Sequence, residues 1–600
     1  MTTPAPNAPN INPLQTAADL LNTGEIDGAV KLLRRVLARR PMDAGANQLM
    51  CVALARTGDL AGAITHARRA VTAAPRDADL LHNLGKLLLD AGAFRRDFLE
   101  EAVTHLRAAL GIDPSRTRTR VQLAMGLLSL GRFEEVVALT EGAATDPDLI
   151  LTRADAQAAL ADMPGAISSA RRGLECFPRH AGIGQRVASL TLYLPGCTGP
   201  QILAAHQAWG RILESAAPVP LRPRIENFEP HRPVRLLLLS HDLVRHSVAF
   251  FVEPILRWLD RSRFHITCVS TRPVEDEVSA HLRTLADDWR HWPQCQPGEL
   301  ASLLAGLRPD MLIQLNGLTE GHSLAALTRR PAPIQGSYIG YPASTGLSCI
   351  DFRLADAETE PPTAVEDGVV ERIVRLPDCF TCYSPPVSPP PLRIRPADAP
   401  PTLGSFNQIF KLADPTIAAW ARILNTVPKA VLRLKSRGLE RDIVRTDLVR
   451  RFIAAGIDPA RINMQGWTLD SADHLDQYND IDVALDTWPY NGTTTTCEAL
   501  LMGVPVLALA GEAGTLGTSA SRVGASLLRA AGFPELIAAN EDQFVALAVQ
   551  LLQEREANHL ERPARRALFL NSILCDGPGY GRRLGETLLS MWQKASVRNA

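Results

Sequence analysis

The sequence lacks the features that mark membrane, secreted and nucleic-acid-binding proteins. No stretch approaches the roughly 20 consecutive apolar residues that a membrane-spanning helix needs. Residues 1–13 are polar and proline-rich, without the basic segment and apolar core of a signal peptide. Charge is balanced, with 63 Lys and Arg against 64 Asp and Glu, so no global field attracts nucleic acid or an anionic membrane. We therefore expect a cytoplasmic protein that binds neither membranes nor nucleic acid.

Clusters of metal-binding or disulfide-forming residues are also scarce. Ten cysteines are scattered through 600 residues, which fits reduced thiols better than a disulfide framework. The one close pair, Cys379 and Cys382, has no second pair to complete a zinc site. Asp480 and Asp482 form an Asp-X-Asp match, but Asp482 opens a predicted buried strand and the pattern is common. We expect no metal, and a chain of this length is expected to fold as several domains.

The first third of the sequence is repetitive. A small residue, a second small residue and a proline recur with a period of 34 residues, and one copy is stretched by five. The copies contain Gly24, Ala29, Pro41; Gly58, Ala63, Pro75; Gly92, Ala102, Pro114; Gly131, Val136, Pro147; and Ala166, Pro178. This is the period of tetratricopeptide repeats, in which two antiparallel helices meet at small residues. We predict a repeat solenoid over residues 14–180 that binds an extended protein segment; the alternative is a scaffold or a dimerisation surface.

Strand and helix patterns alternate in the rest of the chain. Residues 181–233 are predicted as a helical linker, and residues 384–401 as a proline-rich linker between two alternating series at 234–383 and 402–600. The apolar strand runs lie at 235–240, 264–270, 311–315, 403–406, 430–434, 462–464, 483–485 and 506–509. Such alternation predicts two doubly wound, Rossmann-like parallel sheets. Two such lobes facing a cleft form the GT-B architecture of many nucleotide-sugar glycosyltransferases.

Residues 486–500, with the sequence DTWPYNGTTTTCEAL, join a predicted strand to a helical stretch through four threonines. The free N–H groups and the positive dipole end of a helix start attract anions, and threonine hydroxyls add donors. Phosphate is the natural ligand of such a turn. The alternative is that the threonines only cap the helix.

Several stretches, in order along the chain, resemble one family. The stretches are residues 330–335, 340–342, 405–415, 420–424, 486–500 and 521–526. With the repeats in front, the chain is similar to the O-GlcNAc transferase and SPINDLY family from about residue 14 to Trp592. The resemblance implies an enzyme that transfers a sugar from a nucleoside diphosphate to Ser or Thr hydroxyls of proteins, with inversion.

The resemblance also implies which residues contact the nucleotide. Lys411 would neutralise the departing diphosphate, with Gln408 beside it. Further diphosphate and ribose contacts are implied for Thr493, Thr494, Thr495 and Glu498. A carboxylate such as Glu498 is a good acceptor for the two hydroxyls of a ribose.

Other residues are implied at the two ends of the donor. His246 follows the first strand of the N-terminal lobe and is implied over the sugar, as a base or a positioning residue. His474 is implied at the nucleotide. Gly340, Tyr341 and Pro342 form a predicted tight turn suited to close approach of the main chain to the sugar.

The donor stays open at this stage. Ser471 and Thr493 replace a lysine and a histidine of animal O-GlcNAc transferases, and the threonine run is closer to the SPINDLY branch, whose donor is GDP-fucose. Our first hypothesis is transfer of GlcNAc from UDP-GlcNAc; the alternatives are GDP-fucose, or another activated sugar placed on flagellin. A hypothesis of a different class is a non-catalytic adaptor. Protein acceptors would bind the repeats, and the repeats could also join two copies of the chain into a homo-oligomer.

Overall fold

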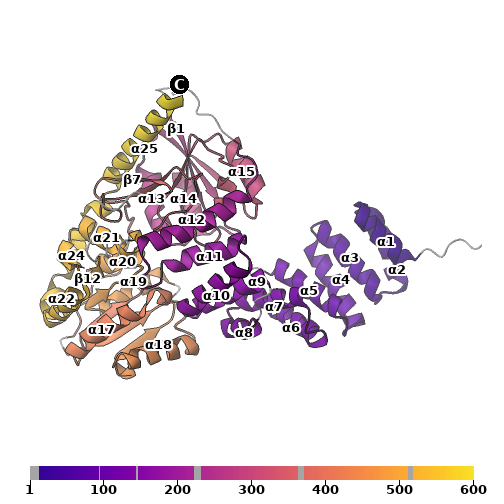
Figure 1. Ribbon diagram of the computed structural model, residues 1–600, viewed down its shortest axis with the longest axis horizontal. Coiled ribbons are helices and arrows are strands. Elements are labelled where there is room, and N and C mark those ends of the chain that lie inside the picture. The colour runs from indigo at the N-terminus through magenta and orange to yellow at the C-terminus, as the bar shows by residue number, and fades with distance from the viewer. Residues whose placement is uncertain are drawn as a thin grey trace, which may run out of the picture. The chain divides into compact units, whose positions relative to one another are not determined.

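The computed structural model describes residues 12–92, 95–142, 146–221, 232–362, 370–396, 398–468, 470–510 and 518–599. These residues belong to two compact units, residues 1–159 and residues 160–600 (Figure 1). Residues 222–231 of the predicted helical linker and residue 397 of the proline-rich linker lie outside the described ranges.

The first unit is a row of antiparallel helix pairs. Its helices are α1 (Pro13–Thr23), α2 (Ile26–Arg39), α3 (Ala44–Arg56), α4 (Leu60–Ala73), α5 (Ala78–Ala91), α6 (Arg96–Ile112), α7 (Thr117–Ser129), α8 (Phe133–Leu139) and α9 (Pro147–Ala159). The second small residue of each repeat, such as Ala29, Ala63 or Ala102, is fully buried because it lies where two helices meet. Gly24, Gly58 and Gly131 have positive φ angles, which let the chain reverse after a helix.

The second unit begins with three helices, α10 (Met163–Cys176), α11 (Ala181–Thr191) and α12 (Gly199–Ser215). Helix α12 starts at a capping box formed by Thr198 and Gln201. Its Trp209 is buried in the same apolar cluster as Leu237 and Leu239 of the first sheet. The segment predicted as a helical linker is thus packed against the first lobe.

The first lobe is a seven-stranded parallel sheet in the order β3-β2-β1-β4-β5-β6-β7. Its strands are β1 (Val234–Ser240), β2 (Phe264–Ser270), β3 (Asp288–His291), β4 (Met311–Gln314), β5 (Ile334–Ser337), β6 (Phe352–Ala355) and β7 (Arg372–Arg375). Its helices are α13 (Ala249–Trp258), α14 (Glu277–Leu285), α15 (Pro297–Gly306) and α16 (Leu324–Leu327). Leu236 and Leu238 of β1 join one apolar cluster and Leu237 and Leu239 another. Burial on both faces explains why β1 is continuously apolar.

The second lobe repeats this arrangement with the strand order β10-β9-β8-β11-β12-β13. Its strands are β8 (Thr402–Ser405), β9 (Val431–Lys435), β10 (Ile462–Gln465), β11 (Val483–Leu485), β12 (Val506–Leu509) and β13 (Ile537–Ala538). Its helices are α17 (Asp414–Thr426), α18 (Asp442–Ala454), α19 (Ser471–Asp476), α20 (Thr494–Leu501), α21 (Val523–Ala531), α22 (Glu541–Gln553), α23 (Arg555–Leu560) and α24 (Arg562–Leu570). The predicted fold class, a helical solenoid followed by two doubly wound parallel sheets, is confirmed.

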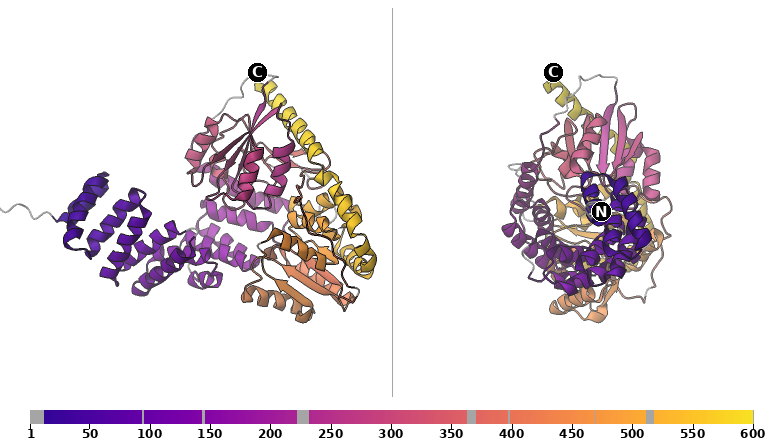
Figure 2. Two further views of the ribbon diagram at one scale, coloured as in Figure 1. Left: turned by 180° about the vertical axis from the view of Figure 1, so that it is seen from behind. Right: turned by 90° about the vertical axis from the view of Figure 1, so that its right-hand side faces the viewer.

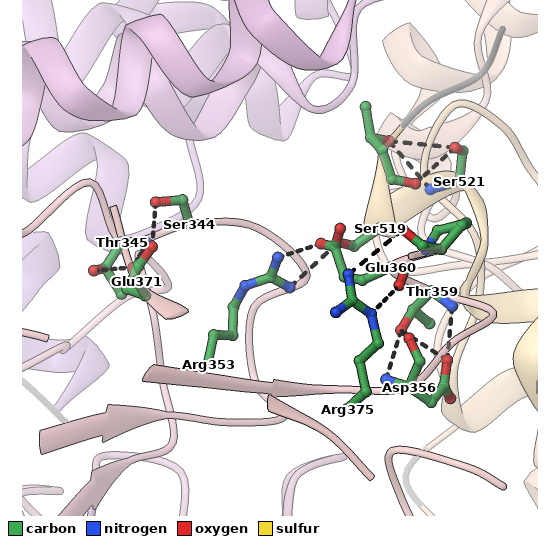
Figure 3. Close-up of polar contacts among 12 residues, drawn as sticks. Ser344, Thr345, Arg353, Asp356, Thr359, Glu360, Glu371, Arg375, Ser519 and Ser521 are labelled. Atoms are coloured by element: carbon green, nitrogen blue, oxygen red, sulfur yellow. Dashed lines mark hydrogen bonds and ion pairs between the residues drawn. The ribbon is translucent and has the colours of Figure 1, made fainter. Parts of the chain in front are cut away.

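Buried polar contacts join the two lobes where the chain leaves β6 (Figure 3). Arg353 and Ser519 both donate to the carboxylate of Glu360, and Arg353 also donates to Ser519 Oγ at 3.2 Å. Asp356 accepts hydrogen bonds from the main chain of Thr359 at 2.6 Å and from the hydroxyl of Ser526. Ser519 and Ser526 belong to the second lobe, so these contacts hold the α21 region against the carboxyl end of β6.

The last helix, α25 (Gly577–Asn599), follows the second lobe in sequence but returns to the first (Figures 1 and 2). It packs on α13, and the hydroxyl groups of Tyr580 and Tyr338 lie 2.7 Å apart in a buried hydrogen bond. The lobes are therefore connected at two places far apart in the sequence.

Candidate functional site

The second sheet creates a crevice where its strand order reverses. From β8 the chain proceeds to β9 and β10 on one side, whereas β11 leads to β12 and β13 on the other. The loops after β8 and β11 therefore diverge at the carboxyl edge of the sheet, the usual ligand position in such folds. These two loops contain Gln408, Lys411 and the start of the threonine run.

Asp486, directly after β11, organises this crevice. Its buried carboxylate accepts hydrogen bonds from the main-chain N–H of Thr487 at 2.8 Å and of Gly492 at 2.6 Å. Asn407 donates to the same carboxylate at 3.2 Å and accepts from the Thr495 hydroxyl at 3.0 Å, which joins the two loops. A Cβ at Gly492 would lie 2.5 Å from Thr495 Oγ1, so only glycine fits. We had not singled out Asn407 from the sequence.

Lys411 lies directly beside the threonine loop. Its Nζ donates to the carbonyl oxygen of Asn491 at 2.7 Å and lies 4.2 Å from the centre of the Tyr490 ring. Burial lowers the pKa of Lys411 to about 8, although the Asp486 carboxylate favours the protonated form. Burial raises the pKa of Asp486 to about 6 against the effect of its hydrogen-bond donors and Lys411. The crevice thus holds a weakly solvated cation next to a helix start.

The threonine run supplies the first turn of α20, with Thr493 as the residue before the helix. The Thr495 hydroxyl donates its hydrogen bond to Asn407. The hydroxyl oxygen of Thr494 is buried and has no hydrogen-bond partner among the described residues. A buried hydroxyl without a hydrogen-bond partner costs free energy.

His474 belongs to a partly buried chain of polar groups with Glu498. Its Nε2 lies 3.0 Å from Glu498 Oε2, and its Nδ1 lies 2.7 Å from Lys435 Nζ at the end of β9. Because a lysine ammonium only donates, Nδ1 accepts and the proton on Nε2 is donated to Glu498. Tyr478 also donates to Glu498 at 3.3 Å. Burial lowers the pKa of Lys435 to about 8.

Lys435 was not singled out from the sequence, although a lysine that ends an apolar strand is a usable signal. A narrow pocket lies between the ends of β8 and β9 and is lined by Asn407, Gln408 and Lys435 among others. Gln408 Oε1 lies 3.4 Å from the hydroxyl of Ser436, which itself accepts from the Ile409 N–H at 2.9 Å. The structure therefore brings together Gln408, Lys411 and the threonines, and joins His474 to Glu498.

His246 lies in the loop after β1 of the first lobe. Its Nδ1 accepts a 3.3 Å hydrogen bond from the Val248 N–H and lies 3.8 Å from Asp242 Oδ2. Burial lowers the pKa of His246, opposed by Asp242. Asn316, after β4, donates to Asp242 at 2.6 Å and accepts from the His241 N–H at 2.9 Å, so it fixes the loop. The charge of Arg437, in the second lobe, also lowers the pKa of His246.

The turn at Gly340, Tyr341 and Pro342 is packed into the first lobe. A Cβ at Gly340 would lie 2.0 Å from the carbonyl oxygen of Leu315, so the turn needs glycine for packing on the main chain after β4. The buried Tyr341 hydroxyl is 2.7 Å from His206 Nε2 on α12. The Tyr341 side chain of this turn is therefore buried and hydrogen-bonded within the protein.

The sequence matches one family profile, described as Glycosyl transferase family 41, over residues 223–383 and 396–580. This chain belongs to glycosyl transferase family 41. The family resemblance read from the motifs is therefore confirmed, and the matched segments include the crevice of the second lobe and the loop that carries His246.

Relatives of this family 41 chain come from plants, animals and bacteria. It is 33% identical over 431 residues to a probable UDP-N-acetylglucosamine–peptide N-acetylglucosaminyltransferase SPINDLY from Solanum lycopersicum, a match that covers 70% of this chain and 45% of that protein. It is 23% identical over 487 residues to the UDP-N-acetylglucosamine–peptide N-acetylglucosaminyltransferase of Caenorhabditis elegans, covering 60% and 41%. The chain thus spans less than half the length of these relatives.

One solved structure covers nearly the whole family 41 chain. It is a mutant of the O-GlcNAc transferase from Thermobaculum terrenum, with a TM-score of 0.73 and 28% identity over 93% of this chain and 98% of that one. The similarity includes both the helical region and the two sheets.

The carboxylates of the Asp-X-Asp match, Asp480 and Asp482, bind other groups of this chain. Asp480 accepts from Arg433 at 2.6 Å. Asp482 accepts from Arg395 at 2.5 Å and from the Thr402 N–H at 2.6 Å, and it also contacts His559. Cys379 and Cys382 are buried free thiols. Within the described ranges, no helix has the length and apolarity that crossing a bilayer requires.

Proposed function

We propose that this chain transfers a sugar from a nucleoside-diphosphate donor to Ser or Thr hydroxyls of proteins. The observation that supports this most directly is the position of Lys411, 2.7 Å from the main chain of the loop that leads into the threonine helix start. A cation and free helix N–H groups converge there at the carboxyl edge of a doubly wound sheet.

The crevice suits the departure of a diphosphate. The acceptor oxygen attacks the anomeric carbon, the bond from that carbon to the diphosphate oxygen breaks, and the electron pair stays on the diphosphate. Lys411 and the first turn of α20 neutralise this charge, with the hydroxyl of Thr494 as a further donor. The acceptor hydroxyl loses its proton to a base. Attack from the side opposite the leaving group inverts the anomeric centre.

Glu498 and His474 are proposed to hold the nucleoside. A carboxylate can accept about four hydrogen bonds, and Glu498 accepts from His474 and Tyr478 in the structure. It therefore retains acceptor capacity for a ribose diol. Gln408 lies in the same crevice and is proposed to contact the diphosphate.

His246 is proposed as a positioning residue at the sugar end. Since Nδ1 accepts from the Val248 N–H, the neutral ring carries its proton on Nε2 and donates from there. Such a ring can orient an oxygen of the donor, whereas proton abstraction through Nε2 requires the other tautomer. Gly340 and its neighbours contribute main-chain atoms to this end of the cleft in our proposal.

The proposed donor is UDP-GlcNAc, in keeping with the names of the plant and nematode relatives. GDP-fucose is the second candidate, because the threonine run is closer to the SPINDLY branch. The repeats are proposed to bind the acceptor protein, and the ten free thiols fit action in the reducing cytoplasm.

A thermal-shift panel tests the donor. UDP-GlcNAc, GDP-fucose and a CMP-activated sugar are added to the intact chain in EDTA, because our proposal includes no metal. A ligand that binds only the folded state raises Tm with its concentration, so UDP-GlcNAc should raise it most. If no nucleotide sugar shifts Tm and none is transferred to protein, the adaptor hypothesis becomes the better account.

A further inference from the structure

The first lobe also has a crevice where its strand order reverses. From β1 the chain continues to β2 and β3, whereas β4 leads to β5 on the other side. A pocket of about 270 Å³ lies there at the carboxyl edge of the sheet. It is lined by His241 after β1, Thr271 after β2, Trp292 after β3 and His322 after β4, with Leu300 of α15 as part of its wall. Ligands of doubly wound folds bind at this position.

The wall of this pocket is preformed on one side. A Cβ at Gly321, whose φ is +72°, would lie 2.4 Å from the His241 ring, so the imidazole packs directly on the glycine. The His241 N–H is also held at 2.9 Å by Asn316, the residue that fixes the His246 loop. This side of the pocket is therefore fixed by contacts within the protein.

The pocket is uncharged, unlike the crevice of the second lobe. Its lining among the described residues contains no Asp, Glu, Lys or Arg. Burial lowers the pKa of His241, and that of His322 to about 4, so both rings are neutral at pH 7. Such a lining offers a phosphate or carboxylate no charged side chain, whereas Trp292 and Leu300 offer apolar surface.

The size and position of the pocket further limit which ligand it can bind. A volume of about 270 Å³ is below the roughly 300–1,000 Å³ of pockets that enclose whole small ligands. It is large enough for one anchoring side chain of a protein partner. His241 and His246 belong to the same loop, and Asn316 binds both the His241 main-chain N–H and Asp242, whose carboxylate lies 3.8 Å from His246 Nδ1.

We propose that this pocket binds an uncharged aromatic or large apolar side chain of the acceptor protein, near the hydroxyl that receives the sugar. The inference rests on the proposed function, because the acceptor is defined by it. The pocket would select among hydroxyl residues by their neighbours, while the second lobe binds the donor.

Direct binding is tested with N-acetyl-phenylalaninamide as a probe, observed by saturation-transfer NMR on the full chain. Ala325, which lines the pocket and is only partly buried, is replaced by Trp to fill it. Ala280→Trp, at an exposed position of α14, is the matched control. We expect the probe to bind the wild type and the control, and to bind Ala325→Trp at least tenfold more weakly. Equal binding to all three proteins, or stronger binding of N-acetyl-aspartamide, overturns the proposal.

Transfer is tested with serine peptides varied at each flanking position, using the donor identified by the thermal-shift panel. The wild type should prefer an aromatic or large apolar residue at one position by at least tenfold in kcat/KM. In Ala325→Trp this preference should vanish through a higher KM for the peptide, with the donor KM unchanged. A preference that survives the filled pocket overturns the inference. If the wild type modifies no peptide, the proposed function fails, and the probe experiment still decides whether the pocket binds such side chains.

Discussion

The two lobes of the second unit share a strand order but differ in the chemistry of their crevices. Each sheet is parallel and reverses its order between its first and fourth strands in sequence. At the reversal, the second lobe presents Lys411, Lys435 and the threonine helix start, whereas the first presents two neutral histidines and Trp292. In both lobes, the topology therefore supplies the location of a crevice, and the loop residues supply its chemistry.

This difference suits the two lobes to different substrates. A donor with two phosphates needs cations and N–H groups, and the second lobe provides both. A protein acceptor needs shape and apolar contacts more than charge, and the first lobe provides these. The two lobes are held together by α25 and by the contacts of Glu360 and Asp356, so both crevices keep a defined relation.

The largest expected effect comes from removing the cation of the second lobe. Lys411→Ala should lower kcat about 10²–10³-fold, because it removes a preorganised charge from the departing diphosphate. Lys429→Ala, an exposed lysine of the same lobe, is the control and should retain activity. Transfer rates measured with saturating donor decide the matter, and wild-type rates in Lys411→Ala would remove the proposed mechanism.

The second-largest expected effect should distinguish the role of the first lobe from that of the second. His246→Ala is expected to lower kcat about 10²-fold through loss of positioning, while the donor dissociation constant changes little. His281→Ala, an exposed histidine on α14 of the same lobe, serves as the control. Calorimetric titration of the donor together with steady-state kinetics makes the distinction. A large loss of donor affinity in His246→Ala would break the division between the lobes.

A change of pH is expected to have a smaller effect on activity. Because the pKa of Lys411 in the folded chain is about 8, kcat/KM for the donor should fall above pH 8, by about tenfold per pH unit. The pKa is lower than the ordinary value of 10.5, so the unfolded chain binds more protons between these values and the free energy of unfolding should rise there. Lys435 also has a pKa of about 8, so the profile is repeated with Lys435→Arg. A flat profile from about pH 7 to 9.5 in both proteins contradicts the role of Lys411.

The smallest effect concerns the unpaired hydroxyl of Thr494. Thr494→Val should weaken donor binding about two- to tenfold, the value of one hydrogen bond, and leave the free energy of unfolding unchanged or slightly higher. The same change at the exposed Thr426 of α17 should affect neither quantity. Donor titration and urea unfolding measure the two effects. A clear loss of stability in Thr494→Val would mean that the hydroxyl is a cap and not a ligand contact.

Strongly patterned segments of the fold could be predicted from the sequence. The apolar runs of β1 and β12 lie within a residue of their predicted positions, because strands buried on both faces are continuously apolar. The strands β3, β5, β6, β7 and β13 were missed. They have four or two residues each, and β3 and β7 are only partly buried, so their composition carries little signal.

Parts of the candidate site were foreseeable because they follow predicted strands. Lys411 and the threonine run come after β8 and β11, and parallel strands end at the same edge of a sheet. The roles of Asn407 and Lys435 were not foreseen. Each makes its contacts with residues roughly 40 to 90 positions away, and no local pattern encodes such a pairing.

By itself, the sequence determined the repeats, the alternation of strands and helices, and the threonine turn, because these depend on local periodicity and on the preferences of single residues. Only the tertiary structure decided that Lys411 meets the Asn491 carbonyl, that His474 joins Lys435 to Glu498, and that four separate strand ends enclose an uncharged pocket. These contacts arise from the order in which strands assemble in a sheet, which brings distant segments together at one edge.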